Sequence, residues 1–503
     1  MKLALFLPQI GAYSETFIQN HILFLAPENT VVITSKIGDR WHLPDTPVLE
    51  IKQTGLWAKY SQEDEDRLCG FLHRHGVTHL LIEFPNTFTA IAELNLRRLK
   101  LPLTLHFHGY DASQMLNNEN VVGFYNWTAS VCGGFIAVSE VMKNRLAAHG
   151  IQEDKIYVNY YGVNKEKLKP LAPRNDGRCR FLFIGRFVSK KAPLILLEAF
   201  RIAYQQEKNI ELVMIGDTTE YHAKDNLLER SKAFVKENGL DGVVRFTGSI
   251  PHEKVMDELS MADVYIQHSI KCPETGDSEG LPNSILEASL SGLPVIATIH
   301  EGIPEAVIHG ENGFLVQEGD AQGMAEHIIS LARSPETRTK MGLRSLELNS
   351  IKFDIRTSIA KLRNILLSAE MNITDEAAAH AIAEHEKRNP EYSNSARIKK
   401  IIDENQDSIF VLLGAGYGLT LHWDFIVRSG LKDRISFIVD DNVKTFMGQD
   451  TIPFGKLISD NKGKKIVFLL TVASKENFEL LRKKVDNEVS VTSKVFALSP
   501  YLI

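Results

Sequence analysis

Short apolar runs alternate with longer amphipathic segments along most of this 503-residue chain, and this alternation constrains its fold more than any other feature. Apolar runs bounded by Gly, Pro, Asp or Ser predict buried strands, and the longer segments between them predict helices. Strands that alternate with helices predict βαβ units and a parallel, doubly wound sheet, hence an α/β fold. In the first third of the chain these runs are LALFLP, THLLIEFP, LPLTLHFHG and GGFIAVS.

The alternation is interrupted twice, which predicts three α/β domains. The polar segment NKEKLKPLAPRNDGRCR (164–180) comes first, so we place a boundary near residue 170. The pattern then resumes with RFLFIG, IELVMIGD, VVRFTGSI, ADVYIQHS and PVIAT, and gives way to a charged stretch at 370–407. We expect an N-terminal domain at 1–170, a second domain at 171–368, a helical linker at 369–406 and a small Rossmann-like domain at 407–503.

Composition excludes several classes of function. The formal net charge of −6 argues against nucleic-acid binding, which needs a basic surface. No apolar run approaches the ~18 to 20 residues of a membrane span, and the first residues lack the basic region of a signal peptide. The four cysteines are too scattered for a disulfide framework or a metal site, so we expect a reducing cytoplasm.

The segment DSEGLPNSILEASLSGLP (277–294) predicts a buried helix at about 282–291 that carries an acid in its middle. Asn283, Glu287 and Ser291 repeat every four residues and form a polar stripe on this apolar helix. A buried carboxylate needs partners, and the two adjacent hydroxyls of a ribose would supply them. The alternative for Glu287 is an ordinary ion-paired helix acid.

Basic residues and a glycine turn flank this segment. Arg186 and Lys191 lie in FIGRFVSKKAPLILLEAF, directly after a strand, where open α/β sheets bind their ligands. Such a pair suits a diphosphate, although a solvated basic loop is the alternative. In GLPVIATIHEGIPEAV, Gly302 begins a turn that would place backbone N–H groups beside a helix start at Pro304, a site suited to an anion.

GRFVSKK, EGLPNSILE and GLPVIATIHEGIPEAV together resemble the retaining glycosyltransferases of family GT4, which have the GT-B fold of two Rossmann-like domains facing a cleft. The resemblance covers about residues 1–365. SETFI, HFHGYD and DSEGLPN further resemble the bacterial exopolysaccharide and colanic-acid members. Three positions depart from the usual pattern, namely Ala192, Asn164 and Thr218, and Thr218 makes the contacts to the nucleotide base less certain.

The resemblance implies a role for each motif residue. Arg186 and Lys191 would hold the donor diphosphate, Glu287 the nucleotide ribose, and Glu279 the transferred sugar. His108 would stand at the rim of the cleft near donor sugar and acceptor, with a purely structural histidine as the alternative. Four further donor contacts are expected at Gly280, Leu281, Gly302 and Ile303, and Ser14 is expected in the cleft-lining loop on the acceptor side or as a helix cap.

The implied reaction moves a hexose from a nucleotide sugar to a saccharide or lipid-linked oligosaccharide in bacterial surface polysaccharide synthesis, with retention of configuration. No cofactor or metal is expected, because the basic pair stabilises the leaving diphosphate and no DxD motif is flanked as a cation site should be. Peripheral contact with the inner face of the membrane stays open. The alternatives are a sugar-nucleotide epimerase of GT-B fold and a non-catalytic sugar-nucleotide-binding scaffold.

The third domain has its own glycine-rich turn. GAGYG (414–418) follows a strand, and Asp440 and Asp441 end the next strand, where an acid can meet a ribose. A second nucleotide or nucleotide-sugar site and a fold used for protein docking are both open.

Overall fold

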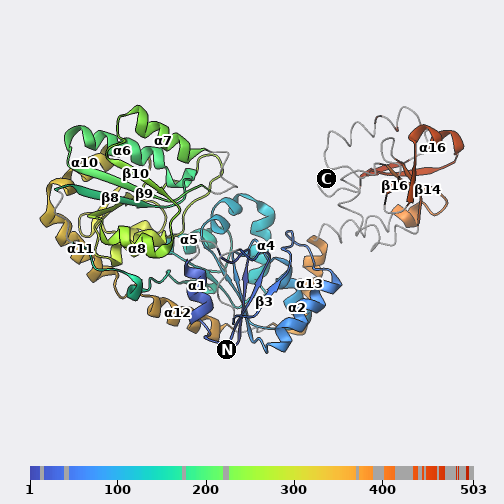
Figure 1. Ribbon diagram of the computed structural model, residues 1–503. Helices are drawn as coiled ribbons and strands as arrows, with labels where there is room; N and C mark the ends of the chain where they lie inside the picture. Colours follow the sequence, from blue (N-terminus) through green and yellow to red (C-terminus); the bar gives the residue numbers. More distant parts are fainter. Residues whose placement is uncertain are drawn as a thin grey trace. The chain divides into compact units, whose positions relative to one another are not determined.

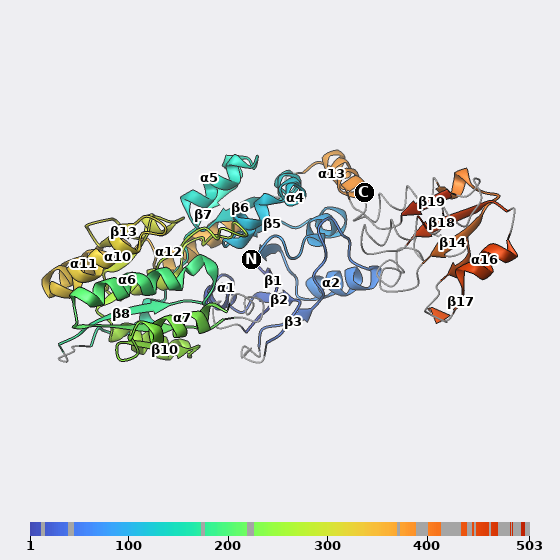
Figure 2. The ribbon, with the colours of Figure 1, turned by 90° about the horizontal axis from the view of Figure 1, so that it is seen from above.

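The chain forms two compact units, residues 1–381 and 382–503, shown in the computed structural model of Figures 1 and 2. The structure describes residues 1–11, 16–38, 45–172, 177–218, 226–369, 373–388, 401–413, 434–439, 445–446, 449–461, 464–470, 483, 485 and 494–497. Within these residues no helix combines the length and apolar character that a membrane span requires.

The first unit contains two separate parallel sheets, as the sequence predicts. The seven strands of the first sheet are, in spatial order, β3 (Val48–Glu50), β2 (Thr30–Thr34), β1 (Leu3–Leu7), β4 (His79–Glu83), β5 (Leu103–His106), β6 (Gly134–Ala137) and β7 (Ile156–Val158). Its helices are α1 (Thr16–Phe24), α2 (Gln62–Arg74), α3 (Ala90–Leu94), α4 (Glu119–Ala129) and α5 (Glu140–Ala148). We call this sheet with its helices the N-lobe.

The second sheet has the same winding. Its order is β10 (Val244–Gly248), β9 (Ile210–Ile215), β8 (Cys179–Ile184), β11 (Val264–Ile266), β12 (Val295–Thr298) and β13 (Gly313–Val316). Its helices are α6 (Pro193–Gln206), α7 (Leu227–Glu237), α8 (His252–Ser260), α9 (Asn283–Leu290), α10 (Ala321–Arg333) and α11 (Pro335–Asn349). We call this sheet with its helices the C-lobe.

Both sheets are closed on both faces, which explains the apolar strands of the sequence. All five residues of β1 and of β2 are buried, as parallel strands covered by helices must be. Local signals set the helix ends: Ser139 caps α5 by accepting a hydrogen bond from the Met142 N–H, and Gly292 follows α9 with a left-handed φ of 82°. The α/β architecture of a GT-B fold is therefore confirmed.

After the C-lobe, the chain returns to the N-lobe through α12 (Ile355–Ser368), as Figure 1 shows. Val163 and Asp354 form a parallel bridge, and the Ser358 hydroxyl donates a hydrogen bond to the Tyr160 carbonyl. The next helix, α13 (Asp375–Arg388), begins inside the segment expected to be a linker. The Trp127 indole N–H donates to the Ala381 carbonyl at 3.0 Å, so the first half of α13 contacts the N-lobe.

The second unit holds a third sheet. Its order is β16 (Thr445–Phe446), β17 (Gln449–Ile452), β15 (Ile435–Val439), β14 (Ile409–Leu413), β18 (Ile466–Leu470) and β19 (Lys494–Ala497), with α16 (Phe454–Asp460) packed against it. All strand pairs are parallel except β16 with β17. The strand predicted before GAGYG is β14 and the next predicted strand is β15, whereas GAGYG, Asp440 and Asp441 themselves lie outside the described residues.

Gly216 directly follows β9, at a position where the packing leaves no room for a side chain. Its φ is 134°, and a Cβ there would lie 2.0 Å from the Gly185 carbonyl oxygen, beside Arg186. We predict that Gly216→Ala lowers the free energy of unfolding by about 2 kcal/mol or more. Gly242→Ala is the matched control, since a Cβ at Gly242 meets no atom within 4 Å. Equal urea midpoints for the two variants would contradict this packing.

Candidate functional site

The candidate site lies at the point where the second sheet changes its winding direction. β8 and β11 are neighbours there, and the loops that follow them, 185–192 and 267–282, leave the carboxyl ends of the two strands. Ligands of doubly wound sheets bind in the crevice at such a switch point. Both basic residues and both acids singled out from the sequence lie in or directly after these loops.

In the loop after β8, a buried side chain next to the basic residues anchors the backbone. Phe187 is fully buried, whereas Arg186 stays exposed next to it. Lys191 ends a single 3₁₀ turn, Ser189–Lys191, and is largely buried. Ala192 follows with a left-handed φ of 37°, the conformation for which glycine is better suited, and Pro193 then starts α6.

Lys191 and Glu279 form a buried ion pair across the two loops, with Nζ 3.3 Å from Oε1. Burial lowers the pKa of Lys191. Burial alone would raise the pKa of Glu279, but the surrounding positive charges, led by Lys191, hold that pKa at about 2. Glu279 is therefore ionised at neutral pH.

The Glu279 loop is fixed at three further points. Lys190 Nζ lies 3.0 Å from Asp277 Oδ2 and donates to the Ser278 carbonyl at 3.2 Å. The Glu279 N–H donates to His300 Nε2 at 3.3 Å, while His300 Nδ1 is 2.6 Å from Glu318 Oε1. The backbone of the loop is thus held, whereas among the described residues Glu279 Oε1 meets no well-aligned hydrogen-bond donor.

Glu287 lies on α9 at the other end of the same pocket. Its Oε1 is 3.0 Å from His252 Nε2, at the start of α8. One pocket is lined by Arg186, Lys191, Glu279, Asn283 and Glu287, together with Ile184, Gly185, Ile250, His252, Val255 and Ser284. The structure therefore brings the predicted basic pair and both predicted acids into a single pocket.

The glycine turn at 302 differs from the expectation. The Gly302 N–H donates to the Gly280 carbonyl and the Ile303 N–H to the His300 carbonyl, each at 3.0 Å. The helix expected from Pro304 is only the 3₁₀ turn Ile303–Glu305. Both N–H groups are engaged within the protein, so the anion site inferred from free N–H groups is not formed there.

His108 lies in the N-lobe, after β5, and both of its ring nitrogens already have protein partners. Nε2 is 2.7 Å from Glu83 Oε2, and Nδ1 is 2.6 Å from the Tyr161 hydroxyl. Burial lowers the pKa of His108 to about 3, so its ring is neutral. The ring nitrogens are thus engaged within the N-lobe, and the His108 backbone is the part that approaches the C-lobe, while a role of His108 near donor sugar and acceptor stays a prediction.

The backbones of the two lobes touch beside Glu279. A Cβ on Gly280 would lie 2.7 Å from the His108 carbonyl oxygen, and a Cβ on Gly109 would lie 3.0 Å from the Ser278 carbonyl oxygen. Only glycine permits this approach. Leu281 is buried beside the contact, whereas Ser14 lies outside the described residues.

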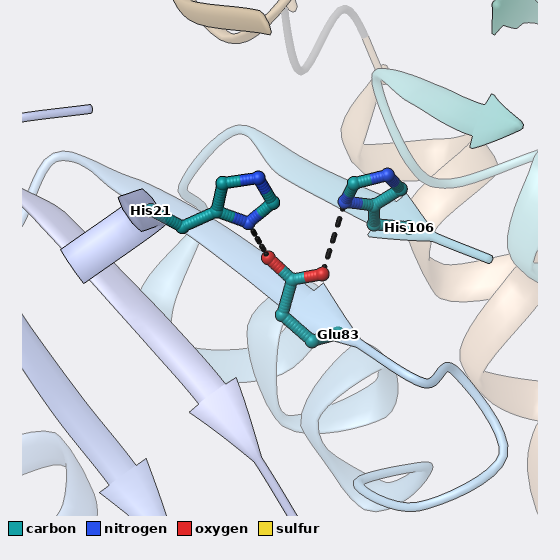
Figure 3. A group of neighbouring side chains, drawn as sticks. All are labelled: His21, Glu83 and His106. Atoms are coloured by element: carbon teal, nitrogen blue, oxygen red, sulfur yellow. Dashed lines mark hydrogen bonds and ion pairs between the residues drawn. The ribbon is translucent and has the colours of Figure 1, made fainter. Parts of the chain in front are cut away.

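Three residues with a part in this site were missed from the sequence: Glu83, His252 and His300. Glu83 ends β4 at the switch point of the first sheet and is fully buried, with His21 and His106 beside it in Figure 3 and His108 as a third neighbour. Its signal was an acid closing the otherwise apolar run HLLIE. Among the residues that the structure describes, His21, Glu83 and His106 also bring possible metal-ligand atoms within 4.8 Å of one another.

The chain matches two family models along the first unit. Residues 67–167 match the family described as Glycosyltransferase Family 4, and residues 164–346 match Glycosyl transferases group 1.

Two bacterial glycosyltransferases are among the curated relatives. The amylovoran biosynthesis glycosyltransferase AmsK of Erwinia amylovora is 30% identical over 228 residues, 45% of this chain and 54% of that protein. The putative colanic acid biosynthesis glycosyltransferase WcaL of Salmonella typhimurium is 27% identical over 248 residues, 49% of this chain and 59% of that protein. The chain thus spans little more than half of the relatives it matches.

Solved structures share the fold at low sequence identity. Anabaena HepE in complex with UDP has a TM-score of 0.60 at 18% identity, covering 73% of this chain and 100% of that chain. A glycosyltransferase from Rickettsia africae has a TM-score of 0.59 at 17% identity, covering 72% and 97%.

The Lys191–Glu279 pair predicts a pH-dependent contribution to stability. Because the folded-state pKa of Glu279 lies below its ordinary 4.5, the contribution is present above that pH and is lost as pH falls towards about 2. Glu279→Gln should reduce the free energy of unfolding by on the order of 2 kcal/mol at neutral pH, and by progressively less in acid. Urea unfolding along a pH series measures this, with exposed Glu237→Gln as control. A difference that stays constant down to about pH 3 would contradict the assignment.

Proposed function

Because the chain belongs to glycosyltransferase family 4, we propose that it transfers a sugar from a nucleoside-diphosphate sugar to a saccharide acceptor. The observation that carries this proposal is the pocket at the switch point of the second sheet, with two cations at one end and a carboxylate on α9 at the other. Anabaena HepE, which shares the fold, was crystallised with UDP and with UDP-glucose, which supports this class of donor.

Each subsite follows from its chemistry. Arg186 and Lys191 face the diphosphate, whose negative charge grows as it leaves, and such charge is best stabilised by cations already in place. Glu287 accepts hydrogen bonds from the ribose hydroxyls, while His252 Nε2 contacts its Oε1. Thr218 ends the described part of the chain after β9, so the contacts to the base stay unassigned.

Glu279 binds the transferred sugar. Its carboxylate is ionised and buried, and its Oε1 has no well-aligned donor among the described residues, so sugar hydroxyls would satisfy it. When the donor binds, Lys191 can turn towards the diphosphate while Glu279 turns to the sugar. Glu279 then acts in binding and charge stabilisation, and not as a nucleophile.

The finer features of the reaction come from the family. We propose transfer of a hexose with retention of configuration, in which the departing phosphate oxygen takes the proton of the acceptor hydroxyl. The two cations provide the charge stabilisation that a divalent metal would otherwise supply, so no metal is required at the diphosphate. The names of the two relatives place them in amylovoran and colanic acid synthesis, which supports an exopolysaccharide or its lipid-linked precursor as acceptor.

Variants of the pocket test the function. We predict that Lys191→Ala and Glu287→Ala each lower the rate of nucleoside diphosphate release from a nucleotide sugar by about 10²-fold, since each removes a charged contact to the donor. A panel of nucleotide sugars, with and without a saccharide acceptor, measures this rate.

The matched controls are Lys236→Ala and Glu237→Ala, exposed residues on α7 of the same lobe, which should keep the wild-type rate. Unchanged rates in the pocket variants would refute the site. An epimerised nucleotide sugar formed without acceptor would refute transfer.

A further inference from the structure

Three histidine side chains of the N-lobe converge on one buried carboxylate. Glu83 Oε1 is 2.7 Å from His21 Nδ1 on α1, and Glu83 Oε2 is 2.9 Å from His106 Nδ1 and 2.7 Å from His108 Nε2. Figure 3 shows His21 and His106 both pointing at the two carboxylate oxygens. We call these four residues the Glu83 cluster.

Hydrogen bonding explains the charge state of the cluster. Burial disfavours charged imidazole and lowers the pKa values of His106 and His108. The pKa of Glu83 lies well below its usual range, because burial is outweighed by its imidazole partners, led by His106. An ionised carboxylate is stabilised by the imidazole nitrogens that face it when these nitrogens carry hydrogens.

The tautomer of His108 is determined by Tyr161, which contacts the ring nitrogen that does not face Glu83. Burial raises the pKa of the Tyr161 hydroxyl, so this group keeps its proton and donates it to His108 Nδ1. The hydrogen of the neutral ring is then on Nε2, facing Glu83. Glu83 and Tyr161 together hold the His108 ring in one tautomer and one orientation.

A divalent metal is the other way to compensate a buried carboxylate. With ligand atoms about 2.0 to 2.1 Å from a tetrahedral ion, neighbouring ligands would stand about 3.3 Å apart. His21 Nδ1 lies 2.7 Å from Glu83 Oε1 in a hydrogen bond, and His106 Nδ1 approaches Glu83 Oε2 to 2.9 Å without a well-aligned hydrogen bond, so both separations are shorter than the spacing of two zinc ligands. The geometry therefore favours hydrogens over a metal.

A series of contacts connects His108 with the loop that carries Glu279, the predicted sugar-binding acid. The His108 and Gly109 N–H groups each donate to Asp111 Oδ1 at 2.9 Å, forming a tight turn directly after the cluster. This turn meets the Ser278–Gly280 backbone at the glycine contacts described above. The Ser113 hydroxyl in turn accepts the Ser278 N–H at 3.1 Å. A continuous set of contacts therefore runs from Glu83 through His108 to the loop of Glu279.

We propose that Glu83 is a positioning residue for the transfer reaction: it fixes His108, and thereby the N-lobe turn that braces the Glu279 loop. This inference rests on the proposed transferase function. Glu83 touches neither the nucleotide end of the pocket nor the reacting atoms. Its loss should therefore impair the chemical step and leave nucleotide binding intact.

Kinetics of Glu83→Gln test the proposal. We expect kcat for nucleotide-sugar turnover to fall by about 10²-fold, the size of effect that a small misplacement near the reacting groups produces. The Kd of the nucleoside diphosphate, measured by calorimetry, should change by less than about threefold. The matched control is Glu93→Gln, another fully buried N-lobe acid, which pairs with Arg97 and Lys59 and should keep its kcat.

A double-mutant cycle separates positioning from general destabilisation. If Glu83 acts through His108, Glu83→Gln combined with His108→Asn should be no slower than the slower single variant. Glu93→Gln combined with His108→Asn should be additive. Additive effects of Glu83 and His108, or wild-type kcat in folded Glu83→Gln, would overturn the proposal.

A measurement on the wild-type chain needs no turnover. Long-range ¹H–¹⁵N spectra of ¹⁵N-histidine protein should show His108 as a neutral ring protonated at Nε2, its signal identified by its loss in His108→Asn. The opposite tautomer would overturn the proposal, as would one equivalent of zinc bound to His21, Glu83 and His106 in metal analysis. A wild-type chain with this tautomer but no turnover of any nucleotide sugar would instead refute the proposed function.

Discussion

The buried pair of Lys191 and Glu279 is the interaction on which the pocket of this protein depends. Each charge would be costly alone in the interior, and each is tolerated because the other lies 3.3 Å away. The remaining contacts of the two loops hold this pair in place: Lys190 fixes the carbonyl before Glu279, and His300 fixes its N–H. The protein thus keeps a cation and a carboxylate paired in the pocket. We propose that donor binding replaces this pair with contacts from Lys191 to the diphosphate and from Glu279 to the sugar.

Each lobe has a glutamate near the switch point of its parallel sheet. Glu83 is the last residue of β4, at the switch point of the first sheet. Glu279 lies in the loop that follows β11, at the switch point of the second sheet. Glu279 is compensated by cations, whereas Glu83 is compensated by imidazole nitrogens at 2.7 to 2.9 Å. Close backbone contacts at Gly109 and Gly280, together with the Ser113 hydroxyl that accepts the Ser278 N–H, join the loops of these two sites.

Much of this arrangement follows from sequence, because local patterns determine it. Strand runs, the caps of α5 and α9, and the location of Arg186, Lys191, Glu279 and Glu287 near one sheet edge are all set by residues close in the chain. The Glu83 cluster could not be predicted, since it joins residues from position 21 to 108 through tertiary packing. The same limit explains the turn at Gly302: its N–H finds the Gly280 carbonyl, a partner that only the folded loop brings near.

A crystal structure of the chain with a bound nucleotide sugar tests the central claim most directly. The account predicts the diphosphate against Arg186 and Lys191, the ribose hydroxyls within hydrogen-bond distance of Glu287, about 2.6 to 3.2 Å, and the sugar at Glu279. Lys191 should then have turned from Glu279 towards phosphate. A ligand bound elsewhere, with the Lys191–Glu279 pair unchanged and the pocket between β8 and α9 empty, would contradict it.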